Sequence, residues 1–254
     1  MNLFKTIRYG SKESERKLKK QLGNPYHQTV RAEMFDFLPQ EYSKVLEIGC
    51  NVGNFRQLLN KSCEYWGVEP LEEAAEIAKT KLDKVLTGSY EKVESEIPDN
   101  YFDLVIANDV IEHLENPWNF LQSIRKKMRN ENSSIVLSIP NIRYLGNLKE
   151  LLIKKDWEYK ESGILDITHL RFFTKKSMIR LLKECGFEIE KIEGINSIIY
   201  RKLLLPLYYL IKFTIGSDTI FYQYGIRAKP KKNSSCFLLT AYCILPDLEH
   251  ERKA

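Results

Sequence analysis

The residues best suited to chemistry lie together in one short stretch, Lys44–Phe55 (KVLEIGCNVGNF). An apolar run ends in the acid Glu47, and two glycines, Gly49 and Gly53, follow before a helix is expected to begin near Asn54. A glycine turn lets a ligand come close to the backbone because no Cβ stands in the way. The first turn of a helix adds N–H groups that have no partner within the helix. The stretch therefore predicts the ligand-binding turn of an α/β sheet.

The spacing of the glycines distinguishes two ligand classes. A dinucleotide fingerprint has the form G-x-G-x-x-G. Counted from Gly49, its later glycines would fall at positions 51 and 54, and both are Asn. The observed pattern is E-x-G-x-x-x-G, with the acid ahead of the first glycine, which argues against a dinucleotide at this turn.

The elements that must position this turn alternate along the chain. Strands are expected at 44–48, 65–69, 84–87, 102–107, 134–139, 187–193 and 237–245. Helices are expected from Pro25 to before Pro39, over 54–60, over 71–82, from Pro117, and from Thr174 to before Gly186. Such alternation is typical of βαβ units with a mainly parallel sheet. Fully apolar runs such as that at 102–107 suit strands buried on both faces.

The main domain is expected to span 24–247, after a basic arm at 1–23 and before a tail at 248–254. Two segments break the alternation of strands and helices within it. Residues 141–173 are rich in aromatic and charged side chains and are expected to form a lid after strand five. Residues 198–230 are expected to be an apolar insertion between the last two strands.

The stretch Val45–Gly53 resembles the first motif of the class I S-adenosylmethionine-dependent methyltransferases, VL(D/E)xGCGxG. The resemblance implies a Rossmann-like sheet of seven strands, the last antiparallel, with helices on both faces. Asn51 stands where that motif has Gly, and the turn is expected to survive because Asn tolerates a left-handed backbone.

The resemblance covers roughly residues 24–195. The runs 108–114 (NDVIEHL) and 139–143 (IPNIR) match family motifs after strands four and five. The run 163–174 (GILDITHLRFFT) looks like the signature of a bacterial subgroup associated with surface-polysaccharide synthesis. Four motifs in order on the expected elements make a strong case for the fold and cofactor, and a weak one for the acceptor.

The resemblance also implies which residues bind the cofactor. Glu69, which closes strand two, would accept hydrogen bonds from the ribose diol, and the turn at Ser89 and Tyr90 would lie by the adenine. Asn108 would line the pocket, and Tyr26 would cover the methionine end. Glu47 would hold the turn or face the methionine ammonium through water. The full set is Tyr26, Glu47, Gly49, Cys50, Asn51, Gly53, Glu69, Pro70, Ser89, Tyr90 and Asn108.

Methyl transfer from a sulfonium leaves the protein to align the acceptor and to remove its proton. A histidine held by a carboxylate suits the second task. We therefore predict His169 as the base and Asp166 as the residue that orients it. The alternative is that these residues and Arg171 pin the lid together without moving protons. His113 either faces the same pocket or bonds a backbone carbonyl.

Arg171 and Asn141 are predicted to contact the acceptor. A guanidinium at Arg171 would suit an anionic acceptor such as a sugar phosphate.

The composition bears on the compartment in which the protein is expected and on the surfaces that it is expected to present. The five cysteines have no C-x-x-C spacing, which favours reduced thiols in a cytoplasmic protein and no metal cluster. No signal peptide and no apolar run of membrane-spanning length is visible. The net charge of +5 has its basic clusters at the N-terminus and at 227–232, and these favour a solvated face. The apolar stretch 198–215 would cover the sheet or acceptor pocket, form a homodimer, or lie at the membrane surface.

The function expected is O-methylation of a sugar, glycan or other small molecule. One alternative is methylation of RNA or protein, although the end of strand four lacks the (N/D)-P-P-(Y/F) run typical of base methylation. Another is a non-catalytic protein of the same fold that binds S-adenosylmethionine.

Overall fold

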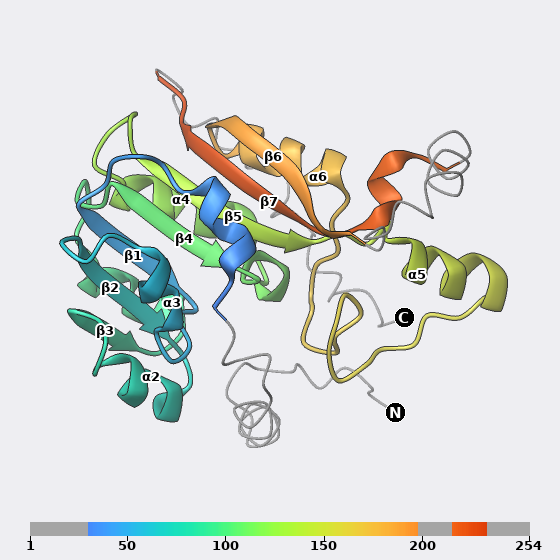
Figure 1. Ribbon diagram of the computed structural model, residues 1–254, viewed down its shortest axis with the longest axis horizontal. Coiled ribbons are helices and arrows are strands. Elements are labelled where there is room, and N and C mark those ends of the chain that lie inside the picture. Colours follow the sequence, from blue (N-terminus) through green and yellow to red (C-terminus); the bar gives the residue numbers. More distant parts are fainter. Residues whose placement is uncertain (1–29, 198–214, 233–254) are drawn as a thin grey trace, which may run out of the picture.

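The computed structural model describes residues 30–197 and 215–232 (Figure 1). The basic arm, Tyr26, almost all of the apolar stretch 198–215 and the strand predicted at 237–245 lie outside these ranges. Within the described ranges, no helix combines the length and the apolar character needed to cross a bilayer.

The fold is built on one sheet of seven strands in the order β3-β2-β1-β4-β5-β7-β6. The strands are β1 (Lys44–Ile48), β2 (Glu64–Glu69), β3 (Lys84–Thr87), β4 (Leu104–Asn108), β5 (Ser134–Pro140), β6 (Phe187–Ser197) and β7 (Phe221–Pro230). The first five pair in parallel, and β7 runs antiparallel between β5 and β6. This confirms the predicted fold class, including the single antiparallel strand at the end of the chain.

The seventh strand of the described sheet, β7, lies earlier in the chain than the predicted run 237–245, which is outside the described residues. Residues 237–245 attracted the prediction because they form a continuous apolar run, whereas β7 contains Gln223, Arg227 and Lys229. The polar side chains of β7 are accommodated by partners, since Arg227 donates to the Leu38 carbonyl and pairs with Glu190. Residues 221–230 are therefore part of the sheet rather than of an insertion.

Helices cover both faces of the sheet, as predicted (Figure 1). The α-helices are α2 (Glu72–Ala78), α3 (Tyr90–Val93), α4 (Pro117–Lys127), α5 (Leu145–Lys149) and α6 (Lys175–Glu184). Shorter 3₁₀ turns are η2 (Ala32–Phe37), η3 (Asn54–Leu58), η4 (Glu94–Glu96), η5 (Ile111–His113) and η8 (Ser217–Ile220), and η6 (Glu150–Lys154) is a π-helix. The helices predicted near 25–38 and 54–60 are thus short 3₁₀ turns over the described residues.

Side-chain caps explain where the two longest helices begin. Asn116 accepts a hydrogen bond from the Asn119 amide at the start of α4, with Pro117 in the first helical position. Thr174 and Ser177 form a reciprocal capping box at the start of α6. By contrast, η3 has Gly53 at its N-cap position and so has no side-chain cap.

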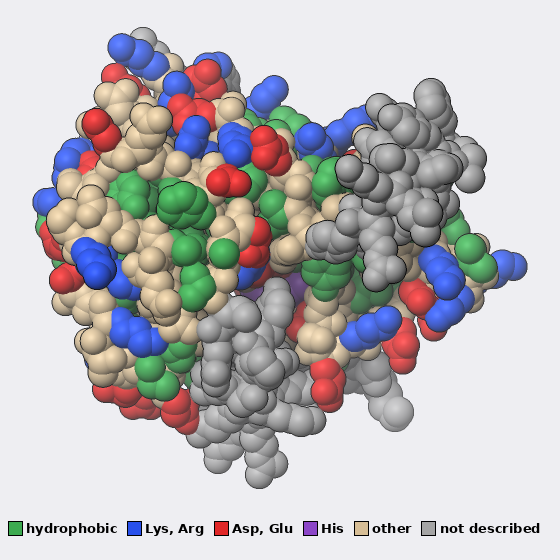
Figure 2. Space-filling model, viewed as in Figure 1, with side chains coloured by type: hydrophobic (Ala, Val, Ile, Leu, Met, Phe, Trp, Pro, Cys, Tyr) green, Lys and Arg blue, Asp and Glu red, His purple; other side chains and the backbone are tan. Residues whose placement is uncertain are grey.

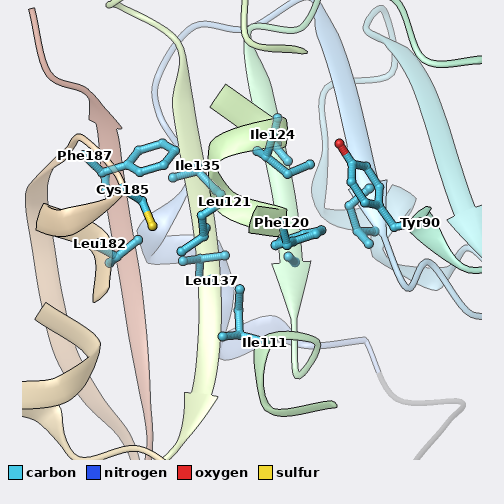
Figure 3. Close-up of a cluster of buried hydrophobic side chains, with 14 of the residues drawn as sticks. Tyr90, Ile111, Phe120, Leu121, Ile124, Ile135, Leu137, Leu182, Cys185 and Phe187 are labelled. Carbon is cyan, nitrogen blue, oxygen red and sulfur yellow. The ribbon is translucent and has the colours of Figure 1, made fainter. Parts of the chain in front are cut away.

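Two apolar cores lie on opposite faces of the sheet. One packs α3, α4 and α6 against the strands, through residues that include Tyr90, Phe120, Leu121, Ile124, Leu182 and Phe187 (Figure 3). The other packs η2, η3 and α2 against the opposite face, through residues that include Met34, Phe37, Phe55, Tyr65 and Ala78. With both faces covered, the carboxyl edge of the parallel strands is where the loops that follow β1, β2 and β4 gather.

Candidate active site at the carboxyl edge of the sheet

The turn after β1 has the backbone that the sequence predicted. Gly49, Asn51 and Gly53 have φ angles of 72°, 48° and 73°, all in the left-handed region. Asn51 therefore takes the conformation expected of the missing glycine. A Cβ on Gly49 would lie 3.1 Å from the Val110 side chain, so this turn packs closely against the loop after β4.

Glu69 fixes the turn from the neighbouring strand. Its Oε2 accepts a hydrogen bond from the Asn51 amide at 2.8 Å, and its Oε1 accepts one from the Leu71 amide at 3.0 Å. Burial raises the pKa of this carboxyl, and the two amide bonds oppose that rise. Each carboxylate oxygen keeps a further lone pair. Glu69 can therefore bind a diol at the rim while it holds the turn in place.

Glu47 points away from the turn into one of the apolar cores. Its carboxylate accepts a hydrogen bond from the Tyr65 hydroxyl, and burial raises its pKa to about 8. The hydrogen bond to Tyr65 opposes this rise, and the charge of Glu69 adds to it. Cys50 is buried beside these groups, and burial raises the pKa of its thiol. The sequence suggested that Glu47 holds the turn through hydrogen bonds from backbone amides. In the structure its carboxylate instead accepts a hydrogen bond from the Tyr65 hydroxyl.

Asn108, at the end of β4, has the features of a ligand-binding side chain. Both atoms of its amide are buried, and neither has a hydrogen-bond partner in the part of the chain that the structure describes. Unpaired buried amides are costly. A polar ligand at the edge of the sheet would satisfy both atoms.

The turn after β3 has a mainly structural role in the described structure. Tyr90 is buried, its hydroxyl bonds Ser123 at 2.6 Å, and its ring packs edge-on against Phe120 at 5.0 Å. The Tyr90 phenol therefore belongs to the core, and the placement of this turn by the adenine stays a prediction. Ser89 precedes α3 and is half-exposed, as is Pro70 after β2.

A polar network beside Asn108 was missed by the sequence analysis. Asp109 has a φ of 55°, and its Oδ1 accepts hydrogen bonds from Ser138 at 2.9 Å and Gln223 at 2.8 Å. Its Oδ2 accepts a charged hydrogen bond from Arg31. The acid at 109 was visible in the NDVIEHL run, but its partners come from distant elements that only the sheet order brings together.

Two histidines meet under the lid. The rings of His113 and His169 pack edge to face with centroids 4.7 Å apart. His169 Nδ1 lies 2.9 Å from the Ile164 carbonyl, and His113 Nδ1 lies 3.2 Å from both the carbonyl and the hydroxyl oxygen of Thr168. Since a carbonyl can only accept, both rings carry a proton on Nδ1, and the neutral form of each ring then has its lone pair on Nε2. Figure 2 shows histidine side chains in the hollow between the sheet and the lid.

The predicted pairing of Asp166 with His169 was wrong. The Asp166 carboxylate accepts from the amide and hydroxyl of Thr168, at 2.8 and 2.7 Å. Thr168 in turn contacts His113, so the acid orients the other histidine through a hydroxyl. Burial and the neighbouring His169 lower the pKa of His113 to about 4.

The two predicted acceptor contacts also have structural partners. Asn141 is fully buried; its amide nitrogen donates to the carbonyls of Asp218 and Phe221, and its oxygen accepts from the Arg143 amide. Its predicted contact with an acceptor was therefore wrong. Arg171 is exposed and donates to the Glu115 carbonyl at 2.5 Å, which joins the lid to the loop after η5.

The raised pKa of Glu47 predicts how stability depends on pH. An unfolded Glu ionises near pH 4.5, whereas the folded carboxyl ionises near pH 8. Between pH 4.5 and pH 8 the folded state therefore binds a proton that the unfolded state has lost, and the free energy of unfolding falls as pH rises through this range. Glu47→Gln removes the titration, so its stability relative to the unsubstituted protein should rise by a few kcal/mol between pH 5 and pH 8. Urea unfolding of both proteins across this range measures the difference.

Tyr65→Phe is the matched variant for this test. Loss of the hydroxyl removes the hydrogen bond that lowers the pKa of Glu47, so the fall in stability should extend to higher pH. Parallel stability curves for the unsubstituted protein and Glu47→Gln from pH 5 to pH 9 would contradict the assignment.

Comparison with known proteins places this site in a family. A family model described as a methyltransferase domain matches residues 16–192, more than half of the chain. The chain is 29% identical over 143 residues to an uncharacterized protein of Methanocaldococcus jannaschii, covering 56% of this chain and 63% of that protein. It is 28% identical over 160 residues to the mitochondrial ubiquinone biosynthesis O-methyltransferase of Schizosaccharomyces pombe, covering 60% and 57%. The chain thus spans about three fifths of the length of these curated relatives.

Solved structures share the fold at low identity. A SAM-dependent methyltransferase from Archaeoglobus fulgidus superposes with a TM-score of 0.59 at 23% identity, covering 84% of this chain and 98% of that one. A possible histamine N-methyltransferase from Thermotoga maritima gives 0.59 at 20% identity, covering 85% and 98%. The chain therefore has the class I S-adenosylmethionine-dependent methyltransferase fold and belongs to the methyltransferase domain family.

Proposed function

We propose that the protein transfers a methyl group from S-adenosylmethionine to a hydroxyl oxygen of a sugar, glycan or other small molecule. The observation that carries the proposal is the pair of imidazoles at the carboxyl edge, His169 buried and His113 half-buried, each with a proton on Nδ1 facing a carbonyl, so that the neutral ring has its lone pair on Nε2. A neutral imidazole is the group that hydroxyl activation requires.

The cofactor is S-adenosylmethionine, since the chain belongs to the methyltransferase domain family and shares the fold of enzymes that depend on it. The residues present fit this molecule. Glu69 offers acceptors for a ribose diol, and Asn108 has an unsatisfied amide. When bound, the cofactor supplies an electrophilic methyl group on a sulfonium.

Activation of the acceptor is the task left to the chain. An alcohol attacks poorly until its proton is removed. His169 is fixed by the Ile164 carbonyl, and we assign it the role of base. His113 lies beside it with a pKa lowered by burial, which keeps the second ring neutral near pH 7.

The acceptor class rests on two supports. The run 163–174 resembles a bacterial subgroup associated with surface polysaccharides, and one relative is named as an O-methyltransferase. Nucleic acid is a poorer fit, because the basic cluster at 227–232 is partly neutralised. Arg227 and Lys229 pair with Glu190, and Lys232 pairs with Glu131.

A cytoplasmic location, a homodimer, and membrane contact through 198–215 remain proposals from the sequence.

The direct test is transfer of labelled methyl from S-adenosylmethionine to a panel of nucleotide sugars, lipid-linked glycans and RNA. Incorporation into a sugar or glycan at oxygen, located by mass spectrometry of the product, is the expected result. Incorporation into RNA alone would overturn the acceptor class. Cofactor binding in calorimetry without transfer to any acceptor would point to a non-catalytic protein.

Two substitutions should separate cofactor binding from chemistry. Glu69→Ala removes the diol acceptors and should weaken cofactor affinity roughly 10- to 100-fold, the range for a charge-assisted hydrogen bond. His169→Ala should lower turnover by about 100-fold or more while cofactor affinity stays within about twofold of normal. Calorimetry for affinity and initial rates for turnover give the two readouts.

Glu69→Gln is the control for the first substitution, because it keeps one oxygen acceptor and should fall between Ala and the unsubstituted protein. Full turnover by His169→Ala would remove His169 from the mechanism.

A further inference from the structure

Three potential metal ligands converge beneath the lid. Glu112 and His113 belong to η5, and His169 comes from the lid. One ligand atom from each lies within 4.8 Å of the other two. None of the three was assigned to a metal by the sequence analysis, because the ligands lie in separate motifs and join only in the fold.

Glu112 is the unexplained member of this cluster. Its side chain is 1% exposed, and neither carboxylate oxygen has a hydrogen-bond partner within residues 30–197 and 215–232. A buried carboxylate without a partner is strongly unfavourable unless a cation or a proton compensates it. The carboxylate lies close to the two imidazoles, whose neutral rings have their lone pair on Nε2.

The backbone keeps Glu112 in this position. Its carbonyl accepts hydrogen bonds from the amides of Leu170 and Arg171, at 2.8 and 3.0 Å. These two bonds bind the lid to η5 beside the cluster.

The two histidines have the arrangement that metal ligands need. Each donates its Nδ1 proton to an oxygen of the lid, from Ile164 or Thr168, which fixes the ring and leaves Nε2 as the lone pair. Metal-bound histidines are typically oriented in this way by a second hydrogen bond. The Asp166 carboxylate accepts from the Thr168 hydroxyl and so extends the support for His113 outward.

We propose that Glu112, His113 and His169 bind one divalent transition-metal ion, of the Zn²⁺, Fe²⁺ or Mn²⁺ class. Two imidazoles and one carboxylate form a three-ligand set that suits these ions and leaves coordination positions open. Bonds to such an ion are about 2.0–2.2 Å long, so the ligand atoms would sit about 3–3.5 Å apart. The side chains would draw in from the present spacing, by rotation of the carboxylate and tilt of the rings.

The open positions suggest a role that rests on the proposed function. A hydroxyl of the acceptor bound to the ion would become more acidic. Its O–H bond breaks with the proton passing to water, the oxygen forms a bond to the methyl carbon, and the S–C bond breaks with its electron pair remaining on sulfur. In this form the imidazoles act on the acceptor through the ion rather than as the base themselves.

The test is calorimetric titration of the full chain, stripped with a chelator, with Zn²⁺ and separately with Mn²⁺ at pH 7.5. One ion should bind per chain. Glu112→Gln and His169→Ala should each weaken binding by more than the roughly 10–100-fold seen when a supporting residue is lost. Thr168→Val removes the hydroxyl that lies beside His113 and donates to Asp166, but it keeps the carbonyl that faces His113, so the loss of affinity should not exceed that range.

Glu115→Gln is the matched control. Glu115 is exposed on the loop after η5, and only its backbone carbonyl contacts the lid, so metal affinity should not change. Circular dichroism on each variant checks that the fold is kept.

No binding by the stripped protein would overturn the proposal and leave a shared proton as the compensation of Glu112. Binding that survives both Glu112→Gln and His169→Ala would place the ion elsewhere and overturn it as well. Methyl transfer that is equally fast with and without the ion would retain the proposed function and overturn the role of the ion in it. Binding that depends on the three ligands, without transfer to any acceptor, would support the site and count against the proposed acceptor class.

Discussion

The hydrogen bonds that Glu69 accepts are the constraint on which the cofactor side of the site depends. The turn after β1 has three residues with positive φ, and only two are glycines. The carboxylate of Glu69 holds the amide of the third, Asn51, and also that of Leu71 after β2. One acid at the end of β2 therefore fixes two loops with respect to each other. Under the proposed function the same carboxylate would also accept the ribose diol, so the rigidity of the turn and the recognition of the cofactor would come from one group.

The acceptor side is organised by a different interaction, between the Glu112 carbonyl and the amides of Leu170 and Arg171. These two bonds attach the lid to η5 through backbone groups alone. Arg171 adds a contact to the carbonyl of Glu115. Displacement of residues 163–173 from η5 would break these contacts together and separate His169 from His113. The lid thus completes the polar cluster rather than simply covering it.

The sequence predicted what local pattern determines. The strands from β1 to β6, the caps of α4 and α6, and the left-handed turn at Asn51 all follow from runs, spacings and residue types that lie close together in the chain. The sequence-based predictions failed for residues whose environment depends on partners from distant parts of the chain. Polar residues such as Gln223 are tolerated in β7 because that strand lies between β5 and β6, whose neighbouring elements supply partners. The sequence does not show these partners, so the more apolar run at 237–245 was predicted as the strand instead. For the same reason Asp166 was paired with His169, its nearest histidine, and Thr168 was overlooked as the group between the acid and His113.

Three glutamates near the carboxyl edge are buried, and the structure compensates the free-energy cost of burying each carboxylate in a different way. Burial raises the pKa of Glu47, Glu69 and Glu112 alike. Glu47 has the Tyr65 hydroxyl, and Glu69 has two backbone amides. Glu112 has two imidazoles in the tautomer that offers lone pairs, and these are acceptors rather than donors. Three acceptors that face one another are stable only with a positive charge among them, and a proton or a divalent ion is what fits the space between them.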